Sequence, residues 1–260
     1  MLELDLRNKV AIVTGAGRGI GKSIAYALMD CGAKVAAVDI SATDLQEAYL
    51  DFPAESLINI VCNVTSEEEV ASMTEQVLSR FGHIDILVNN AGTSTMDFAV
   101  NIKATDWDKV MDINAKGSLF CSKYVARSLL DKGSKGKIIN IASQAGKNGY
   151  RCMGSYCASK HAVIGLTKVM ATELAANNIN VNAVCPGIIE TEMKWRERRE
   201  GAVLRGITAQ DIADEDNSQV PMLRTGKPEE VAYLVCFLAS PLSDYMTGQA
   251  INITGGMTTH

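Results

Sequence analysis

The sequence predicts a single α/β domain built on a doubly wound parallel sheet with helices on both faces. Short apolar, β-branched runs alternate with longer segments of helical period from the first residues almost to the last. Near-continuous apolar strands separated by helices are typical of a parallel sheet that is covered on both sides. Of the 260 residues, 47% are hydrophobic, which is enough to bury a sizeable core. No linker divides the chain, so we expect residues 1–260 to form one domain.

Seven apolar runs are predicted strands. They are KVAIV (9–13), KVAAVD (34–39), INIVCN (58–63), DILVNN (85–90), GKIINIA (136–142), NINVNAVC (178–185) and QAINIT (249–254). Their short length and β-branched side chains are typical of strands inside a sheet. Segments of helical period lie between them, near 19–31, 43–50, 66–81, 106–131, 156–176 and 228–239.

Residues 191–227 break this alternation. The segment follows a predicted strand and precedes a predicted helix, and it has little apolar periodicity. A connection of this length inside a compact domain is usually functional or disordered. We expect it to contain one or two short helices and to form a substrate lid at about residues 190–220.

The charge of the chain argues against nucleic acid and membranes as partners. The net charge is −5, whereas both partners require a concentrated positive surface. The densest basic run, KWRERRE at 194–200, contains acidic residues and is interpreted as a solvated helix face rather than a phosphate-binding patch. The first residues are acidic where a signal peptide is basic, and no apolar run approaches the roughly 20 residues that span a bilayer. We therefore expect a cytoplasmic protein.

Seven cysteines are dispersed along the chain, without a C-x-x-C pair or a histidine at metal-ligand spacing. An odd, scattered set is typical of a reduced compartment. The three histidines form no metal constellation. We therefore predict no metal site.

Polar and glycine residues follow the predicted strands at one edge of the sheet. They are TGAGRGIG after the first strand, Asp39 after the second, Asn63 after the third, NNAG (89–92) after the fourth, Ser143 after the fifth and PG (186–187) after the sixth. In an open α/β sheet, ligands bind in the crevice outside the carboxyl ends of the strands. These groups therefore predict a single binding crevice.

The glycine loop predicts a nucleotide site. Gly15, Gly19 and Gly21 open a helix directly after a strand. Without a Cβ atom the backbone can turn tightly and approach a pyrophosphate, whose charge is stabilised by free amide groups and by the helix dipole. The spacing is G-x-x-x-G-x-G, which departs from the commoner G-x-G-x-x-G fingerprint.

Asp39 ends the second predicted strand and favours NAD over NADP. A carboxylate at this position can accept both ribose hydroxyls of an adenosine, and it repels a 2′-phosphate. The alternative is that Asp39 caps the helix that follows in DISATDLQE, where Ser41 or Thr43 would serve equally well.

Tyr156 and Lys160 are four residues apart and project from one face of a predicted helix. Lowering the pKa of a tyrosine from about 10 toward 7 requires about 4 kcal/mol of preferential stabilisation of the phenolate. We expect the Lys160 ammonium and the positive nicotinamide of an oxidised cofactor to supply it. Such a phenol acts as general base toward an alcohol or as general acid toward a ketone.

Ser143 and Asn114 complete the candidate catalytic set. Ser143 would hydrogen-bond the substrate oxygen and hold it beside the phenol, although SQAG is also a plain turn sequence. Asn114 lies within a long predicted helix, where asparagine is a poor helix former. A water held between Asn114 and Lys160 could complete a proton path, and the alternative is a helix kink without a chemical role.

On these motifs the sequence resembles the short-chain dehydrogenase/reductase family over essentially the whole chain. TGAGRGIG, NNAG, Asn114, Ser143, YCASK and PG with Thr191 occur in that family's order and spacing. The resemblance implies a seven-stranded Rossmann sheet and hydride transfer between a nicotinamide and a carbonyl or alcohol carbon. It also implies a catalytic tetrad of Asn114, Ser143, Tyr156 and Lys160, and a homotetramer.

The resemblance further implies a set of cofactor contacts. They are Gly15, Arg18, Gly19, Ile20, Gly21, Asp39, Asn63, Val64, Asn90, Ala91, Gly92, Tyr156, Lys160, Pro186, Gly187, Ile188 and Thr191. Many relatives have an Asp-Val pair after the third strand, where this chain has Asn63-Val64. The carbonyl of Asn63 can still accept a hydrogen bond from the adenine amino group.

The C-terminal third resembles the subset of the family that oxidises diols and sugar alcohols, including acetoin reductases. The loops at 93–103, 144–155 and 190–220 carry the specificity in the family. The candidate substrate residues are Ser143, Gln144, Lys147, Tyr150, Arg151 and Trp195. They suggest a hydroxylated or anionic small substrate, and the alternative is that Lys147 and Arg151 face solvent or a neighbouring subunit.

These observations predict an NAD-dependent oxidoreductase that acts on a secondary alcohol or ketone of a small polar substrate such as a polyol, sugar alcohol, diol or substituted propanediol. One alternative is a 3-oxoacyl carrier-protein reductase using NADPH, because TGAGRGIG with Arg18 suits that branch. Asp39 opposes NADPH, and docking an acidic carrier would require a basic surface. A second alternative, from another class, is a nucleotide-sensing protein without turnover.

Overall fold

A computed structural model gives the structure of residues 4–260; residues 1–3, which the predicted domain includes, lie outside the described part. Seven parallel strands form one sheet in the order β3-β2-β1-β4-β5-β6-β7. The strands are β1 (Val10–Thr14), β2 (Lys34–Asp39), β3 (Leu57–Val61), β4 (Ile86–Asn89), β5 (Gly136–Ile141), β6 (Ile179–Pro186) and β7 (Ala250–Ile253). The predicted doubly wound, seven-stranded Rossmann sheet is therefore confirmed.

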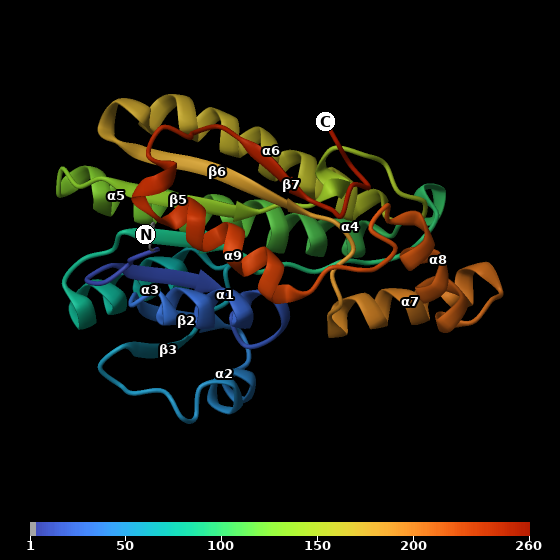
Figure 1. Cartoon of the computed structure of the whole chain (residues 1–260), viewed down its shortest axis with the longest axis horizontal. Coiled ribbons are helices and arrows are strands. Elements are labelled where there is room, and N and C mark those ends of the chain that lie inside the picture. The colour runs from blue at the N-terminus through green and yellow to red at the C-terminus, as the bar shows by residue number, and fades with distance from the viewer. Residues whose placement is uncertain (1–3) are drawn as a thin grey trace.

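Helices cover both faces of the sheet (Figure 1). The helices outside the lid are α1 (Gly19–Asp30), α2 (Ala42–Ala48), α3 (Glu67–Phe81), α4 (Ala104–Met111), α5 (Gly117–Asp131), α6 (Gly154–Leu174) and α9 (Pro228–Ala239). Successive strand residues point to opposite faces, so one strand serves two cores. In β1, Ala11 and Val13 pack with α1 and α9, whereas Val10 and Ile12 pack with α3, α5 and α6.

The predicted helix over 106–131 is interrupted. A five-residue π-helical segment, Asp112–Lys116, separates α4 from α5, and Asn114 lies buried at its centre. Single-turn π segments of this kind occur frequently at functional sites. Here the wider turn presents Asn114 to the loop that follows β4, as the hydrogen bonds described below show.

The segment predicted to form a lid, called the lid below, contains two helices, α7 (Glu192–Arg205) and α8 (Ala209–Gln219). Both begin with a threonine cap, because the Thr191 and Thr208 hydroxyls accept hydrogen bonds from the amides of Lys194 and Asp211. Figure 1 shows α7 and α8 at the end of the molecule toward which the strands point. Within residues 4–260, no helix has the length and apolar character that crossing a membrane requires.

Candidate active site

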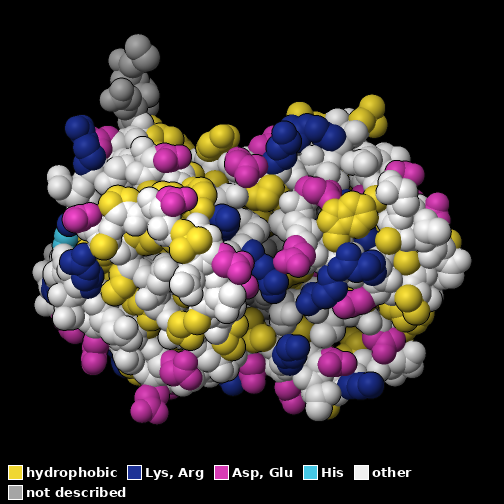
Figure 2. Space-filling model, turned by 90° about the horizontal axis from the view of Figure 1, so that it is seen from below, with side chains coloured by type: hydrophobic (Ala, Val, Ile, Leu, Met, Phe, Trp, Pro, Cys, Tyr) yellow, Lys and Arg dark blue, Asp and Glu magenta, His cyan; other side chains and the backbone are white. Residues whose placement is uncertain are grey.

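A cavity of about 460 Å³ lies at the carboxyl ends of the strands. Its walls come from the loops after β1, β2, β3, β4, β5 and β6 and from the lid helices α7 and α8. Figure 2, seen from below the view of Figure 1, shows a hollow near the centre of the molecule with charged side chains of both signs around it. The strand order reverses between β1 and β4, which is the place where doubly wound sheets bind their ligands.

The glycine loop has the geometry of a phosphate cradle. Gly15 and Gly19 have φ angles of +64° and +55°, a region that residues with a Cβ rarely adopt. The Asn90 side-chain amide donates to the Gly15 carbonyl at 3.0 Å, which fixes the loop. Gly21 was expected to contact the cofactor, but it does not line the cavity. A Cβ at Gly21 would lie 2.0 Å from the Gly15 oxygen, so this glycine allows α1 to pack against the loop.

Asp39 lies at the cavity wall beside this loop. Its Oδ2 accepts a hydrogen bond from the Gly17 amide at 2.9 Å, and its Oδ1 accepts one from the Ser41 amide at 3.1 Å. Ser41, rather than Asp39, caps α2 through the amide of Asp44. The helix-cap alternative for Asp39 is therefore wrong, and two backbone amides hold its carboxylate at the cavity wall.

The other predicted cofactor residues surround the same cavity. Those that line it are Gly15, Arg18, Gly19, Ile20, Asn63, Val64, Asn90, Ala91, Gly92, Tyr156, Lys160, Pro186, Gly187, Ile188 and Thr191. At Asn63 the expected contact changes, because its carbonyl already accepts hydrogen bonds from the amide and the hydroxyl of Thr65. The Asn63 side-chain N–H groups, rather than this carbonyl, are left for an adenine ring.

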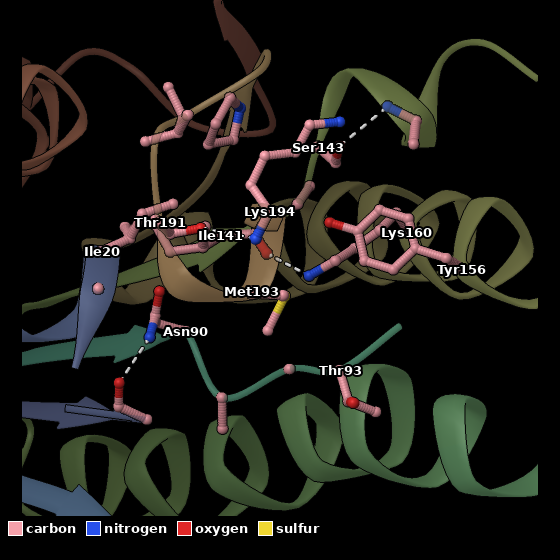
Figure 3. Close-up of a pocket in the computed structure, with 18 of the residues that line it drawn as sticks. Ile20, Asn90, Thr93, Ile141, Ser143, Tyr156, Lys160, Thr191, Met193 and Lys194 are labelled. Carbon is pink, nitrogen blue, oxygen red and sulfur yellow. Dashed lines mark hydrogen bonds between the residues drawn. The ribbon is translucent and has the colours of Figure 1, made fainter. Parts of the chain in front are cut away.

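Tyr156 and Lys160 project into the cavity from α6 (Figure 3). The Lys160 ammonium lies 5.6 Å from the centre of the Tyr156 ring and donates to the Ile141 carbonyl at 2.8 Å. Ser143 follows β5, lines the cavity beside Tyr156 and opposes the rise in the pKa of its phenol. A serine hydroxyl, a phenol and an ammonium are thus brought to one end of the cavity, next to the candidate dinucleotide cradle.

Burial controls the ionisation of this group. Burial raises the pKa of the Tyr156 phenol, the negative charge of Glu197 adds to this effect, and the Ser143 hydrogen bond opposes it. Burial also lowers the pKa of the Lys160 ammonium to about 8. In the chain without a cofactor, desolvation dominates the pKa of Tyr156. The expected lowering by Lys160 together with a positive nicotinamide stays a prediction.

Asn114 holds the loop after β4 against α6. Its side-chain amide donates to the Thr93 carbonyl and to the Ser159 hydroxyl, both at 2.9 Å, and its carbonyl accepts from the Thr93 amide at 2.8 Å. A Cβ at Gly92 would lie 3.3 Å from the Asn114 Oδ1 and 3.7 Å from the Lys160 Nζ. Asn114 and Lys160 therefore approach each other across Gly92. The water between them stays a prediction.

The candidate substrate residues divide into two groups. Gln144 and Tyr150 line the cavity with Ser143. The other three, Lys147, Arg151 and Trp195, do not line it. Lys147 donates to the carbonyls of Ala250 and His260 and so fixes the C-terminal segment.

Arg151 lies over the Phe98 ring at 5.2 Å. Trp195 is 37% exposed and stacks with Arg198. Lys147, Arg151 and Trp195 are consequently structural in this conformation, and the polar substrate that they suggested loses its support.

Sequence reasoning missed several residues of the cavity wall. The most informative are Thr93, Met153, Met193, Lys194, Asp216, Gln219 and Met257. The run at 194–200 was interpreted as a solvated face, and this interpretation is wrong for Lys194, which lines the cavity, and for Arg198, which is 2% exposed. For Lys194 and Arg198, the only signal in the sequence was their place in the predicted lid, because this segment has no apolar periodicity.

Comparisons with known proteins agree with this geometry. Residues 15–258 match a family model described as "Enoyl-(Acyl carrier protein) reductase". The chain is 40% identical over 260 residues to a 3-oxoacyl-acyl-carrier-protein reductase FabG of Thermotoga maritima, covering 98% of this chain and 99% of the relative. It is 38% identical over 256 residues to a protein of the same name from Vibrio cholerae, with the same coverage.

A solved structure is similar as well. The crystal structure of a short-chain type dehydrogenase/reductase from Mycobacterium marinum is 36% identical and superposes with a TM-score of 0.89, covering 99% of this chain and 98% of that chain.

These relatives correct the sequence-based prediction of function. The C-terminal third was taken to indicate a polyol or diol dehydrogenase, whereas relatives that match nearly the whole chain are named 3-oxoacyl-acyl-carrier-protein reductases. The dehydrogenase prediction is therefore wrong. By its family match over residues 15–258, its sheet and its similarity to a solved short-chain dehydrogenase/reductase, this chain belongs to the short-chain dehydrogenase/reductase family of oxidoreductases.

Proposed function

We propose that this protein reduces the keto group of a 3-oxoacyl thioester to a 3-hydroxyacyl thioester with NADH. The observation that carries the proposal is one continuous cavity, which joins the Gly15–Asp39 region to Ser143, Tyr156 and Lys160. The full-length similarity to proteins named 3-oxoacyl-acyl-carrier-protein reductase supports the substrate class.

The roles of the side chains follow from their contacts. Ser143 and Tyr156 hydroxyls donate hydrogen bonds to the keto oxygen, and bound NADH supplies the hydride to the keto carbon. As negative charge develops on that oxygen, Tyr156 transfers its phenolic proton to it, which completes the alcohol. The Lys160 ammonium, fixed by the Ile141 carbonyl, stabilises the phenolate that is left. Asn114 holds the Thr93 backbone beside this group.

The ionisation states support the reductive direction. A raised pKa keeps the Tyr156 phenol protonated at neutral pH, which is the state that a general acid requires. A Lys160 pKa of about 8 keeps the ammonium largely charged there.

Asp39 supports NADH over NADPH. Its carboxylate is held by two backbone amides at the cavity wall, where the 2′-phosphate of NADPH would meet a like charge. Assembly into a homotetramer stays a prediction from the family resemblance.

A kinetic comparison tests the proposal. The purified protein is supplied with the 3-oxobutanoyl thioester of pantetheine and with NADH or NADPH in separate assays. We expect steady consumption of NADH, slower consumption of NADPH, and a rate reduced about 100-fold in Ser143→Ala, which lacks one donor to the keto oxygen. Ser72→Ala, an exposed serine on α3, is the matched control and should behave like the parent. Absence of thioester-dependent consumption of either dinucleotide would refute the proposal.

A further inference from the structure

The lid contributes one cation to the wall of the cavity. Lys194 lies in the first turn of α7, its side chain is 20% exposed, and it lines the cavity with Asp216 and Gln219 of α8. Figure 3 shows Lys194 in the same close-up as Ser143, Tyr156 and Lys160. The proposed mechanism, which involves Ser143, Tyr156, Lys160 and Asn114, gives Lys194 no role.

Two carboxylates hold the Lys194 ammonium in place. Its Nζ lies 3.3 Å from an oxygen of Asp216 and 4.0 Å from an oxygen of Glu197. Asp216 is fixed in turn by Arg198 at 2.9 Å, and Glu197 accepts a hydrogen bond from the Ser94 hydroxyl at 2.7 Å. These contacts hold the Lys194 ammonium at the cavity wall.

The charged groups around Lys194 include more carboxylates than cations. The cations Lys194, Arg196 and Arg198 face the carboxylates Glu190, Glu197, Glu200 and Asp216 within ion-pair distance of one another. This part of the cavity therefore carries no surplus of positive charge. Such a site does not favour an anionic ligand over a neutral one. It suits a neutral group that accepts a hydrogen bond.

The number of N–H donors on Lys194 indicates which neutral group of the substrate it can bind. An ammonium has three N–H donors and no acceptor. Of the two neighbouring carboxylates, only Asp216, at 3.3 Å, is near enough to take a donor, because Glu197 at 4.0 Å is beyond hydrogen-bond distance. At least one N–H of Lys194 is therefore left for the cavity. A 3-oxoacyl thioester has two oxygens of this kind, and Ser143 with Tyr156 takes only the keto oxygen at C3.

We infer that Lys194 donates a hydrogen bond to the thioester carbonyl oxygen at C1, and that this contact selects 3-oxoacyl thioesters over simple ketones. The inference rests on the proposed function and names how its substrate is recognised. Asp216 and Glu197 act as positioning residues for the ammonium. A simple ketone leaves the Lys194 donor without a partner in a largely buried site, and such mismatches are penalised strongly.

A matched pair of substrates isolates this contact. The first is the 3-oxobutanoyl thioester of pantetheine, and the second is the keto thioether in which a methylene replaces the C1 carbonyl. We expect Lys194→Met to lower kcat/KM for the thioester about 10- to 100-fold and to leave kcat/KM for the thioether within about threefold of the parent. Lys194→Arg, which keeps a charged donor, should recover part of the preference.

Controls separate the possible failures. Arg199→Met changes an exposed residue of the same helix and should keep the parent's preference, and thermal melts establish that each variant folds. If the parent does not reduce the thioester, the proposed function fails. If the parent does reduce it but Lys194→Met slows both substrates equally, only the Lys194 inference is overturned. A parent preference for free 3-oxobutanoate over its thioester would also overturn it, because it would indicate an anion site.

Discussion

The two walls of the cavity are built in different ways. The wall beside β1, β2 and β4 consists mainly of backbone and small residues, fixed by contacts such as that from Asn90 to Gly15. The lid wall includes the charged side chains of Glu192, Lys194 and Asp216, and behind it Arg198 joins Glu190 to Asp216. Backbone geometry cannot adjust without a change of fold, whereas an ion-pair network can exchange partners. We infer that the first wall fixes the dinucleotide and that the lid sets the substrate.

The largest expected effect is on kcat and comes from replacing Tyr156, which lies between the two walls. Tyr156→Phe removes the proton donor and should lower kcat about 1,000-fold, while the Kd for NADH measured by fluorescence titration stays within about twofold of the parent. This result would separate chemistry from cofactor binding. A Tyr156→Phe enzyme with the parent's kcat would remove the phenol from the mechanism.

A second substitution tests the backbone-rich wall. Asp39→Asn keeps an acceptor for the Gly17 amide and removes the charge that opposes a 2′-phosphate. The ratio of kcat/KM for NADH to that for NADPH should fall about 100-fold, because a like-charge contact costs several kcal/mol. Asp51→Asn, at an exposed position, should leave the ratio unchanged. An unchanged ratio in Asp39→Asn would show that another residue selects the cofactor.

A third substitution tests the lid wall. Arg198→Met leaves the carboxylates of Glu190 and Asp216 without their main partner, and breaking a buried pair costs about 3–5 kcal/mol. Amide hydrogen exchange should accelerate about 100-fold in α7 and α8, and it should remain unchanged in β1 and β4. Arg199→Met serves again as the control. Equal acceleration in the sheet would contradict the independence of the two walls.

The pH dependence of the rate gives a smaller effect. The Lys160 pKa is lowered to about 8, so the ammonium loses its proton as the pH rises through this value. With Tyr156 still protonated, kcat/KM for reduction should fall up to tenfold per pH unit above about pH 8. A rate independent of pH up to pH 10 would mean that the charge of Lys160 is not required.

The smallest effect concerns stability. Below pH 8, Lys160 is charged in the folded and the unfolded chain, so the full cost of burying the charge is present. Between pH 8 and its ordinary value of 10.5, the unfolded chain binds more protons, so this group's contribution to the free energy of unfolding rises with pH. Lys160→Met should therefore stabilise the protein at pH 7 by about 1–3 kcal/mol in urea denaturation, while abolishing activity. A destabilised variant would show that the Ile141 contact outweighs desolvation.

The same contrast explains what the sequence could predict. The strands and the wall beside β1, β2 and β4 were predictable, because apolar runs mark the strands and the glycines and Asp39 directly follow strand ends that meet at one edge of the sheet. The tetrad was predictable because Tyr156 and Lys160 lie one helical turn apart and because all four positions match a family pattern.

The substrate wall was not predictable for a physical reason. Lys194 and Asp216 are 22 residues apart in the sequence, and their contact depends on how α7 packs on α8. Lys147 looked like a substrate contact, but it binds carbonyls more than 100 residues away in the sequence. Asn63 kept its place at the cavity and changed its role, because Thr65 occupies its carbonyl.

The most direct test follows the hydride itself. The protein is incubated with a 3-oxobutanoyl thioester and NADH that carries deuterium on the transferred face of its nicotinamide C4, and the products are analysed by mass spectrometry and NMR. The account predicts a 3-hydroxybutanoyl thioester with deuterium at C3. A thioester left unreduced, or a product without deuterium, would contradict it.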